Sequence, residues 1–188
     1  MRSLEFVVRF HTAFRVGSTY ARDGVDAALD RHDPLPADHL KGLMLAAAVD
    51  LLGRKEAEGV FGSAAQPCAW SWTSAHVDDP EGWRFDHRHR VKIDEKTHSA
   101  SKDQLVLGEQ AFAPTARFTV HRVRHLDSAD ESWQVLVLRA SASAVHGIGA
   151  WRRRGLGWVG IEPAAGQVTA ADVATLLTRT ANTSGSST

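Results

Sequence analysis

The stretch Gly147-Ile-Gly-Ala-Trp-Arg-Arg-Arg-Gly-Leu-Gly157 contains two Gly-x-Gly steps separated by five residues, three of which are consecutive arginines. Glycine tolerates positive φ angles and lets backbone N–H groups approach a ligand closely. The guanidinium group of arginine is a fork-shaped donor that suits phosphate. The stretch therefore predicts a phosphate-binding loop made by Gly147, Gly149, Arg152, Arg153, Arg154, Gly155 and Gly157. The alternative is a helix-to-strand connection whose arginines face water.

The segments on either side place this glycine loop between a helix and a strand. Acidic residues from Asp127 onward precede apolar residues at helical spacing, which predicts a helix that reaches Ala144. Residues 156–161 predict a strand after the loop. Residues 169–177 predict a short terminal helix, and the small polar residues 181–188 predict a flexible tail.

The N-terminal part of the chain predicts a strand, a long loop and a helix. Apolar residues recur at even positions from Leu4 to Val16, broken only by Thr12, which is typical of a half-buried strand. Residues 17–37 are rich in Gly, Asp and Pro, and a loop of this length is usually functional or disordered. A helix should follow, with Asp38 as its N-cap and Gly53 as its stop.

The middle of the chain predicts two more core strands with an insertion between them. Residues 59–67 predict a loop, and residues 68–77 and 115–125 predict the strands. Residues 84–93 alternate but carry basic side chains on both faces, so with a returning arm at 105–112 they predict an exposed hairpin inside an insertion, 78–115. Without the insertion the order is β-α-β-β-α-β, which predicts an α+β, ferredoxin-like (RRM-like) domain over residues 1–180.

The composition predicts one cytoplasmic domain. Of 188 residues, 43% are hydrophobic, and the formal net charge is zero with neutral histidines. A neutral chain argues mildly against nucleic-acid binding, but local clusters decide it, and residues 87–92 and 152–154 form two basic clusters. The single cysteine, Cys68, excludes an internal disulfide and fits a reducing cytosol. No apolar run is long enough to cross a membrane, and the N-terminus lacks the pattern of a signal peptide.

Three motifs together resemble the RAMP superfamily, and within it the small Csm/Cmr-type backbone subunit of type III CRISPR RNA-guided effector complexes. The glycine loop follows that superfamily's Gly-x-Gly-x5-Gly-x-Gly form. Leu35-Pro-Ala-Asp-His-Leu-Lys-Gly42 is similar to its Ile-Pro-Gly-Ser-Ser-Leu-Lys-Gly helix start. Arg90-Val-Lys-Ile-Asp-Glu-Lys-Thr97, with Leu107-Gly-Glu109 and Phe112, is similar to its Ile-Asp-Arg-x-Thr-Gly segment and the Leu-x-x-Glu that follows.

The resemblance implies a subunit whose copies stack along a guide (cr)RNA together with other CRISPR effector subunits. It implies that the hairpin is a thumb that interrupts the guide–target duplex. It also implies that an aspartate of the first long loop cleaves target RNA with a divalent metal, Mg²⁺ or Mn²⁺, and Asp26 in Gly24-Val25-Asp26 matches that position. Lys41 and Arg152–Arg154 would follow guide phosphates, and Arg88 and Arg90 would contact RNA or an adjacent subunit.

The chain departs from the family pattern at three positions, and alternatives stay open. Asp38 and His39 replace the two serines of the helix start, and Glu95 replaces the arginine after Ile-Asp. Asp26 could serve as a turn former, in which case the chain would be a guide-RNA scaffold without nuclease activity.

A second alternative is an acetyl-CoA-dependent N-acetyltransferase, since Arg152-x-x-Gly155-x-Gly157 also fits the pyrophosphate motif of those enzymes. That motif opens a helix, whereas residues 158–161 here predict a strand.

Overall fold

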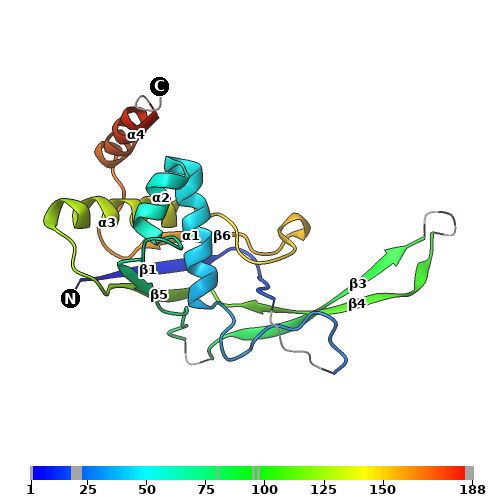
Figure 1. Cartoon of the computed structure of the whole chain (residues 1–188). Helices are drawn as coiled ribbons and strands as arrows, with labels where there is room; N and C mark the ends of the chain where they lie inside the picture. Colours follow the sequence, from blue (N-terminus) through cyan, green and yellow to red (C-terminus); the bar gives the residue numbers. More distant parts are fainter. Residues whose placement is uncertain (1, 18–22, 80, 95, 97, 185–188) are drawn as a thin grey trace.

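A four-stranded antiparallel sheet with helices on one face forms the body of the molecule, and a two-stranded hairpin projects from it (Figure 1). The computed structural model describes residues 2–17, 23–79, 81–94, 96 and 98–184. The strands of the sheet follow the order β2-β5-β1-β6. Their bounds are β1 Ser3–Phe10, β2 Trp70–Trp72, β5 Thr115–Arg122 and β6 Val159–Pro163. This order is that of the ferredoxin-like split βαβ unit, so the predicted fold class is confirmed.

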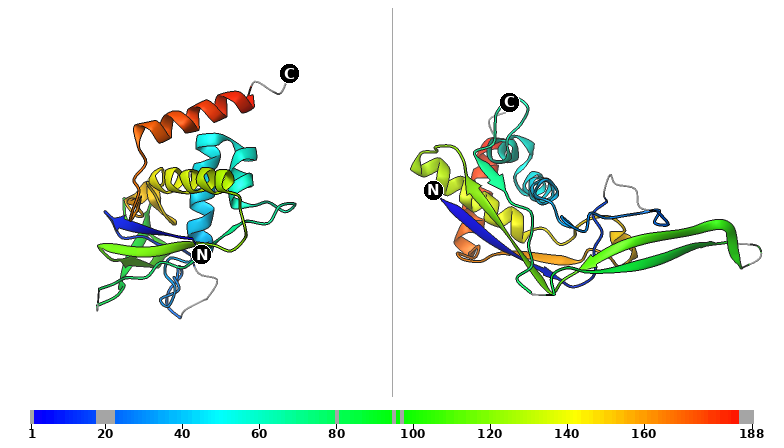
Figure 2. Two further views of the ribbon diagram at one scale, coloured as in Figure 1. Left: turned by 90° about the vertical axis from the view of Figure 1, so that its left-hand side faces the viewer. Right: turned by 90° about the horizontal axis from the view of Figure 1, so that it is seen from below.

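The helices lie on one side of the sheet and leave its other face open (Figure 2). Their bounds are α1 Ala37–Leu52, α2 Arg54–Phe61, α3 Ser128–Ser143 and α4 Ala170–Ser184, with a 3₁₀ turn, η1, at Arg152–Arg154. None of the helices among the described residues is long and apolar enough to cross a membrane.

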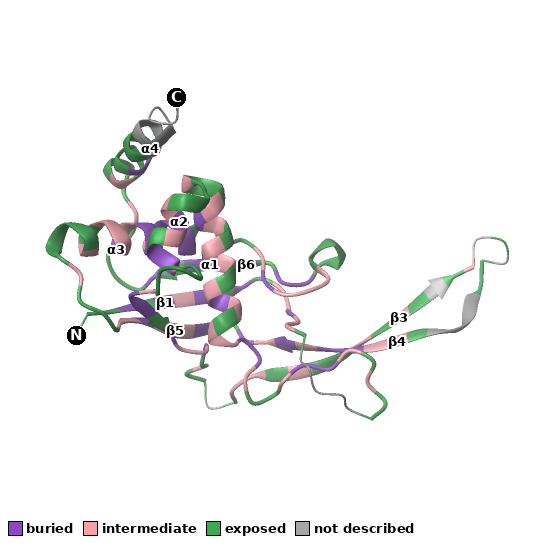
Figure 3. Ribbon diagram, in the orientation of Figure 1, coloured by how far each residue is buried: buried purple, intermediate pink, exposed green. Residues whose placement is uncertain are grey.

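The core forms because alternate strand residues meet one stripe of each helix. The even-numbered residues of β1 are buried, and Phe6 stacks on Phe118 of β5 with ring centroids 5.1 Å apart. Leu40, Met44 and Ala48 supply the buried stripe of α1 at a spacing of four residues. Figure 3 shows that buried residues concentrate between the sheet and the helices, and again at the base of the hairpin.

The first strand is shorter than predicted. β1 ends at Phe10, and beyond it only Phe14 makes an isolated bridge, to Ala111 of the hairpin. The alternation continues because Phe14 is fully buried, stacking on Phe10 at 5.0 Å and meeting Trp83 edge-on at 5.5 Å. Beyond Phe10 the periodicity therefore reflects the burial of Phe14 at the hairpin base, where the chain has already left the sheet.

Two predictions at the helices are wrong. Asp38 does not cap α1, because the N-cap is Pro36 and no side chain caps the helix; Asp38 lies in the first turn instead. The first three residues of the predicted loop at 59–67 belong to helix α2, whose N-cap is Gly53 at φ 84°. One glycine thus ends α1 and starts α2, and Ala57, Val60 and Phe61 are buried by the second helix.

The projecting hairpin consists of β3 (Arg84–Ile93) and β4 (Ala100–Phe112) and lies inside the predicted insertion 78–115. β4 starts earlier than the predicted arm 105–112, so the polar segment between the strands is short. Two residues of the family-like motif here, Glu95 and Thr97, lie outside the described residues.

The C-terminal helix is longer than predicted. α4 runs through Ser184, so residues 181–184 of the predicted tail are helical, and residues 185–188 lie outside the described part. Thr169 and Asp172 cap its start reciprocally, since each backbone N–H donates to the other side chain. Arg179 packs over the Trp133 ring at 4.2 Å and attaches the helix to α3.

Candidate nucleic-acid interface

The glycine loop packs its backbone tightly against the rest of the protein. Gly149 N–H donates to His39 Nε2 (3.2 Å), Ala150 N–H to the carbonyl of Arg15 (2.7 Å) and Gly157 N–H to the carbonyl of Ala13 (2.7 Å). A Cβ at Gly149 would lie 2.2 Å from the Arg15 carbonyl oxygen. The prediction that these N–H groups face a ligand is therefore wrong for Gly149 and Gly157, whose role is close packing. Phosphate binding by the loop then depends on its arginines.

The three arginines form an exposed turn between two left-handed residues. η1 covers Arg152–Arg154, preceded by Trp151 at φ 61° and followed by Gly155 at φ 79°. A left-handed non-glycine residue is strained by about 1–3 kcal/mol, and surrounding contacts must hold it. The Trp151 ring supplies them, because it lies against Gly108 of β4, where a Cβ would be 2.3 Å from Cη2.

Two guanidinium groups pack on the Trp151 ring. Arg15 and Arg90 each place Cζ 5.0 Å from the ring centroid, one from the chain after β1 and the other from the hairpin. Cation–π contacts of this kind contribute about 0.5–2 kcal/mol each. Trp151 therefore joins the glycine loop to the hairpin.

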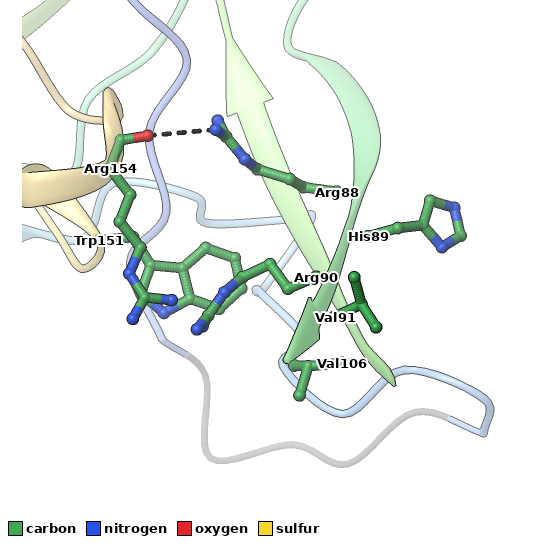
Figure 4. Close-up of a pocket in the computed structure, with 7 residues that line it drawn as sticks. All are labelled: Arg88, His89, Arg90, Val91, Val106, Trp151 and Arg154. Carbon is green, nitrogen blue, oxygen red and sulfur yellow. Dashed lines mark hydrogen bonds between the residues drawn. The ribbon is translucent and has the colours of Figure 1, made fainter. Parts of the chain in front are cut away.

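An open groove of about 880 Å³ lies where the hairpin meets the glycine loop, and it is mainly basic (Figure 4). It is lined by Arg88, His89, Arg90, Val91, Val106, Trp151 and Arg154, with no acidic residue among them. Arg88 Nη2 donates to the carbonyl of Arg154 at 3.1 Å. Figure 4 shows Arg88 and Arg90 directed toward the loop and His89 directed away. The two basic clusters of the sequence, distant along the chain, thus share one groove.

Lys41 and His39 lie at the start of α1 but contact different partners. The Lys41 ammonium packs over the Trp72 ring at 5.4 Å, so its contact with RNA stays a prediction. His39 accepts the Gly149 N–H bond at Nε2, which requires a neutral ring with its proton on Nδ1. Burial, and secondarily the charge of Arg152, lower the pKa of His39 and favour that neutral form.

Asp26 lies on the outer edge of β4. It is exposed, its Oδ2 accepts the Leu107 N–H at 2.8 Å, and its own N–H donates to the Leu107 carbonyl at 3.0 Å. Neighbouring aspartates have structural roles: Asp30 accepts from the His32 and Asp33 N–H groups, and Asp33 accepts from Ser74 Oγ. Asp26 differs because it is exposed beside the hairpin.

No protein-family model and no curated protein matches the sequence, but the fold has solved relatives. A chain of the apo type III-B Cmr-beta cryo-EM structure is similar at a TM-score of 0.65 and 11% identity, over 86% of this chain and 97% of that chain. The fold is that of type III-B Cmr-beta chains.

A chain of the Cmr-beta structure bound to cognate target RNA is similar at a TM-score of 0.56 and 17% identity, over 87% of this chain and 61% of that chain. This protein therefore spans about three-fifths of that Cmr-beta chain. Identities this low define a shared fold, and the target RNA is a property of that complex. The RNA contacts of the present chain have to be argued from its own side chains.

A divalent metal fits this structure only if RNA shares its coordination. Among the described residues, no group of three or more His, Cys, Asp or Glu side chains could hold an ion. Mg²⁺ is often bound by one or two carboxylates together with substrate phosphates and water. Asp26 provides one carboxylate, and no hydrogen bond to its Oδ1 is present among the described residues. Asp26 therefore fits a shared ion and does not make a protein-only site.

One positioning residue, Arg15, has no recognisable signal in the sequence. Its guanidinium donates to the carbonyls of Ala27 (3.2 Å) and Ala28 (3.3 Å), directly after Asp26, while its carbonyl accepts from Ala150. Burial lowers the pKa of Arg15, and the nearby charge of Glu109 opposes that shift. In the sequence Arg15 occupies an odd, outward position like Arg9, and no pattern distinguishes the two.

Glu109, known from the sequence only as part of a motif, is a second positioning residue. It is fully buried, with Oε1 accepting from Arg31 Nη2 at 2.7 Å and Oε2 accepting from the Leu29 N–H at 3.3 Å. The carboxylate thereby fastens the first long loop to the hairpin. Arg15 and Glu109 together hold the segment that carries Asp26 against β4, where Asp26 bonds to Leu107, the residue after the groove residue Val106.

Proposed function

We propose that this chain is a guide-RNA-binding backbone subunit of a type III CRISPR ribonucleoprotein. The observation that carries the proposal is the groove between the hairpin and the glycine loop, where Arg88, Arg90 and Arg154 come together and no acidic side chain is among the described residues that line it. The fold of Cmr-beta chains supports the assignment. In such a role, copies of the chain would stack along the guide and contact other effector subunits.

The groove suits a phosphate backbone and not a particular base sequence. Guanidinium groups bind phosphate oxygens bidentately, and neutralising phosphates releases counterions, which gives affinity that is independent of sequence and falls with salt. Elsewhere on the sheet the arginines are paired. Arg117 of the open face binds both Asp78 and Glu5, and Arg9 lies 3.5 Å from Glu162. These pairs favour the groove as the path of the RNA, although the formal net charge of the chain is zero.

The second part of the proposal is cleavage of bound target RNA at Asp26. Its carboxylate is held by Leu107 at one oxygen and is exposed, so it could hold a Mg²⁺ or Mn²⁺ ion together with a target phosphate. A bound ion would stabilise charge on the reacting phosphate and favour deprotonation of the nucleophile. Asp26 itself would bind and orient that ion.

The variant Asp26→Asn tests cleavage without disturbing the loop. The asparagine carbonyl can still accept the Leu107 N–H bond, but it is a poor metal ligand. In the assembled complex with labelled target RNA and Mg²⁺, we expect Asp26→Asn to slow cleavage by on the order of 100-fold or more. The matched control is Asp23→Asn, an exposed neighbour, which should cleave at the wild-type rate. Cleavage by Asp26→Asn at that rate would remove the catalytic assignment.

A scaffold without nuclease activity is the second candidate, and one observation favours it. The bond from Leu107 N–H gives Asp26 a structural use, because it satisfies an amide on the edge of β4. Wild-type complex that binds target RNA and leaves it intact would support this candidate. The acetyltransferase alternative is weak, since Gly157 leads into strand β6 and the required helix is missing at that point.

Nucleic acid carried by the natively purified protein tests the assignment as a whole. We expect RNA of uniform length with repeat-derived sequence when the bound nucleic acid is extracted and sequenced. The source should be cells that contain the guide RNA and the other effector subunits. If the protein purified from them is a monomer without nucleic acid, the proposed function is contradicted.

A further inference from the structure

Two aromatic rings lie together at one end of the open face of the sheet. Trp158, directly before β6, is 61% exposed, and its ring centroid is 4.5 Å from that of His11, which follows β1 and is also exposed. The planes are tilted by 41°. Since Phe10 pairs with Val159 in the sheet, His11 and Trp158 occupy neighbouring positions beyond that pair.

The backbone of this pair is fixed although the rings are exposed. His11 N–H donates to the Trp158 carbonyl at 3.0 Å, and Trp158 N–H donates to Thr12 Oγ1 at 3.0 Å. Trp158 also forms an isolated bridge with Gly147 at the start of the glycine loop. A ring held on a fixed backbone loses little conformational entropy when a flat ligand packs on it.

The surroundings of Trp158 favour a nucleobase over a protein partner. Its described contacts with other side chains are polar, to the His11 ring and to Thr12 Oγ1, and the arginines of the glycine loop precede it by four to six residues in the chain. The other large exposed apolar side chains lie on α1, the hairpin and α4, and after β5 at the opposite end of the sheet. A protein interface centred on Trp158 would require further apolar side chains around it. Unpaired bases need only an aromatic face and nearby positive charge.

We propose that Trp158, supported by His11, is a stacking platform for one unpaired base of a single-stranded RNA whose phosphates lie on the arginines of the glycine loop. The inference rests on the proposed RNA-binding function and adds a base contact to it. The open sheet face is also where RRM-type domains stack bases on aromatic side chains. Here the aromatic pair lies at the end of the strands, next to the glycine loop.

The test uses the full-length chain and a single-stranded RNA that carries 2-aminopurine at successive positions. Stacking on an aromatic ring is worth about 1–3 kcal/mol per base, which corresponds to roughly 5- to 150-fold in affinity. We expect Trp158→Ala to weaken binding by at least about 5-fold and to abolish the 2-aminopurine quenching seen with wild type at one position. Trp158→Phe should restore most of the affinity, because a phenyl ring also stacks on a base. The control Leu177→Ala, which removes another exposed apolar side chain, should change neither.

The salt dependence separates the platform from the phosphate contacts. Trp158→Ala should keep the wild-type slope of log Kd against log salt, because no phosphate contact is lost. If wild type binds RNA and Trp158→Ala binds equally well, the platform is refuted and the proposed function stands; if wild type does not bind RNA, both fail. Loss of self-association in Trp158→Ala without RNA, measured by sedimentation with RNA affinity unchanged, would assign Trp158 to a protein interface and overturn the proposal.

Discussion

At the scale of single residues, Gly149 shows most clearly what the glycines of the loop do. It has φ 67°, and its Cβ position lies 2.2 Å from a backbone carbonyl oxygen that cannot move without shifting the loop. Gly155 has a similar φ of 79°, but nothing lies within 4 Å of its Cβ position. Substitution of Gly155 therefore measures the free-energy cost of the left-handed backbone alone, whereas substitution of Gly149 adds the cost of steric overlap.

We expect Gly155→Ala to lower the free energy of unfolding by about 1–2 kcal/mol, since alanine must adopt the left-handed region. Gly149→Ala should cost a further 1–3 kcal/mol or so for the steric overlap. Urea unfolding of both variants measures the difference. Equal losses for the two variants would show that the loop relaxes freely around residue 149.

His39 makes the contact between α1 and the glycine loop sensitive to pH. Its pKa in the folded protein lies below the ordinary value of 6.5, so as pH falls below 6.5 the unfolded chain takes up the proton first and the folded state loses stability. Above that pH the residue adds no pH dependence. The variant His39→Gln keeps a neutral acceptor for the Gly149 N–H at every pH.

We expect wild-type protein to lose more stability between pH 7.5 and pH 5 than His39→Gln does, as measured by guanidinium unfolding. An exposed histidine, His125, supplies the control, and His125→Gln should follow wild type. A His39→Gln variant with the wild-type pH profile would argue that the ring is not held neutral.

Residue types were the easiest part of the candidate site to predict from the sequence. Arginines at 152–154 and a lone Asp26 are visible there, since their chemistry suits phosphate and metal. Arg15 and His39 were not predicted in their positioning roles, because each acts on a backbone group that is remote in sequence, Ala27 or Gly149. Such contacts carry no periodic or motif signal.

At the scale of elements, the buried Glu109 fixes the first long loop to the hairpin. Arg31, its partner, has 42% of its side chain exposed, whereas the Glu109 side chain is completely buried. The pair is therefore asymmetric. Removing Arg31 takes from a buried carboxylate its hydrogen-bonded counter-charge and leaves the more distant Arg15 and His87, while neutralising Glu109 leaves a guanidinium that water can solvate.

We expect Arg31→Ala to destabilise the protein by about 2–4 kcal/mol and Glu109→Gln by about 1–2 kcal/mol, with the loop amides near Leu29 exchanging hydrogen faster in both. Urea unfolding and hydrogen exchange provide the measurements. In the double variant the cost should be less than the sum of the two. A larger loss for Glu109→Gln than for Arg31→Ala would contradict this account of the pair.

Element types could be predicted, but several of their ends could not. Helical and alternating spacing report which side is buried, and for that reason the β-α-β-β-α-β order is correct. The same signal cannot show where strand pairing stops, so the alternation continues to Val16 although β1 ends at Phe10. Gly53 and Gly59 are typical of a break in the chain and so conceal helix α2. In the structure Gly53 serves both helices, and Gly59 has open space around its Cβ position.

At the scale of the whole molecule, the groove is a product of topology. The hairpin is inserted between β2 and β5, and the glycine loop connects α3 to β6, yet Trp151 packs on Gly108 and Arg90 packs on Trp151. The sequence shows two basic clusters but does not show that they lie side by side in the folded chain. Only the fold places Arg88 and Arg90 opposite Arg154 in a neutral chain.

The salt dependence of RNA binding tests this groove most directly. Each phosphate contact to single-stranded RNA contributes about 0.7 to the slope of log affinity against log salt, so replacing Arg88, Arg90 and Arg154 together by alanine should reduce the slope by about 2. Arg54→Ala, on α2 with 77% of its side chain exposed, should leave the slope unchanged. The account predicts a weaker and less salt-dependent complex for the triple variant; a triple variant with the slope and affinity of wild type would contradict it.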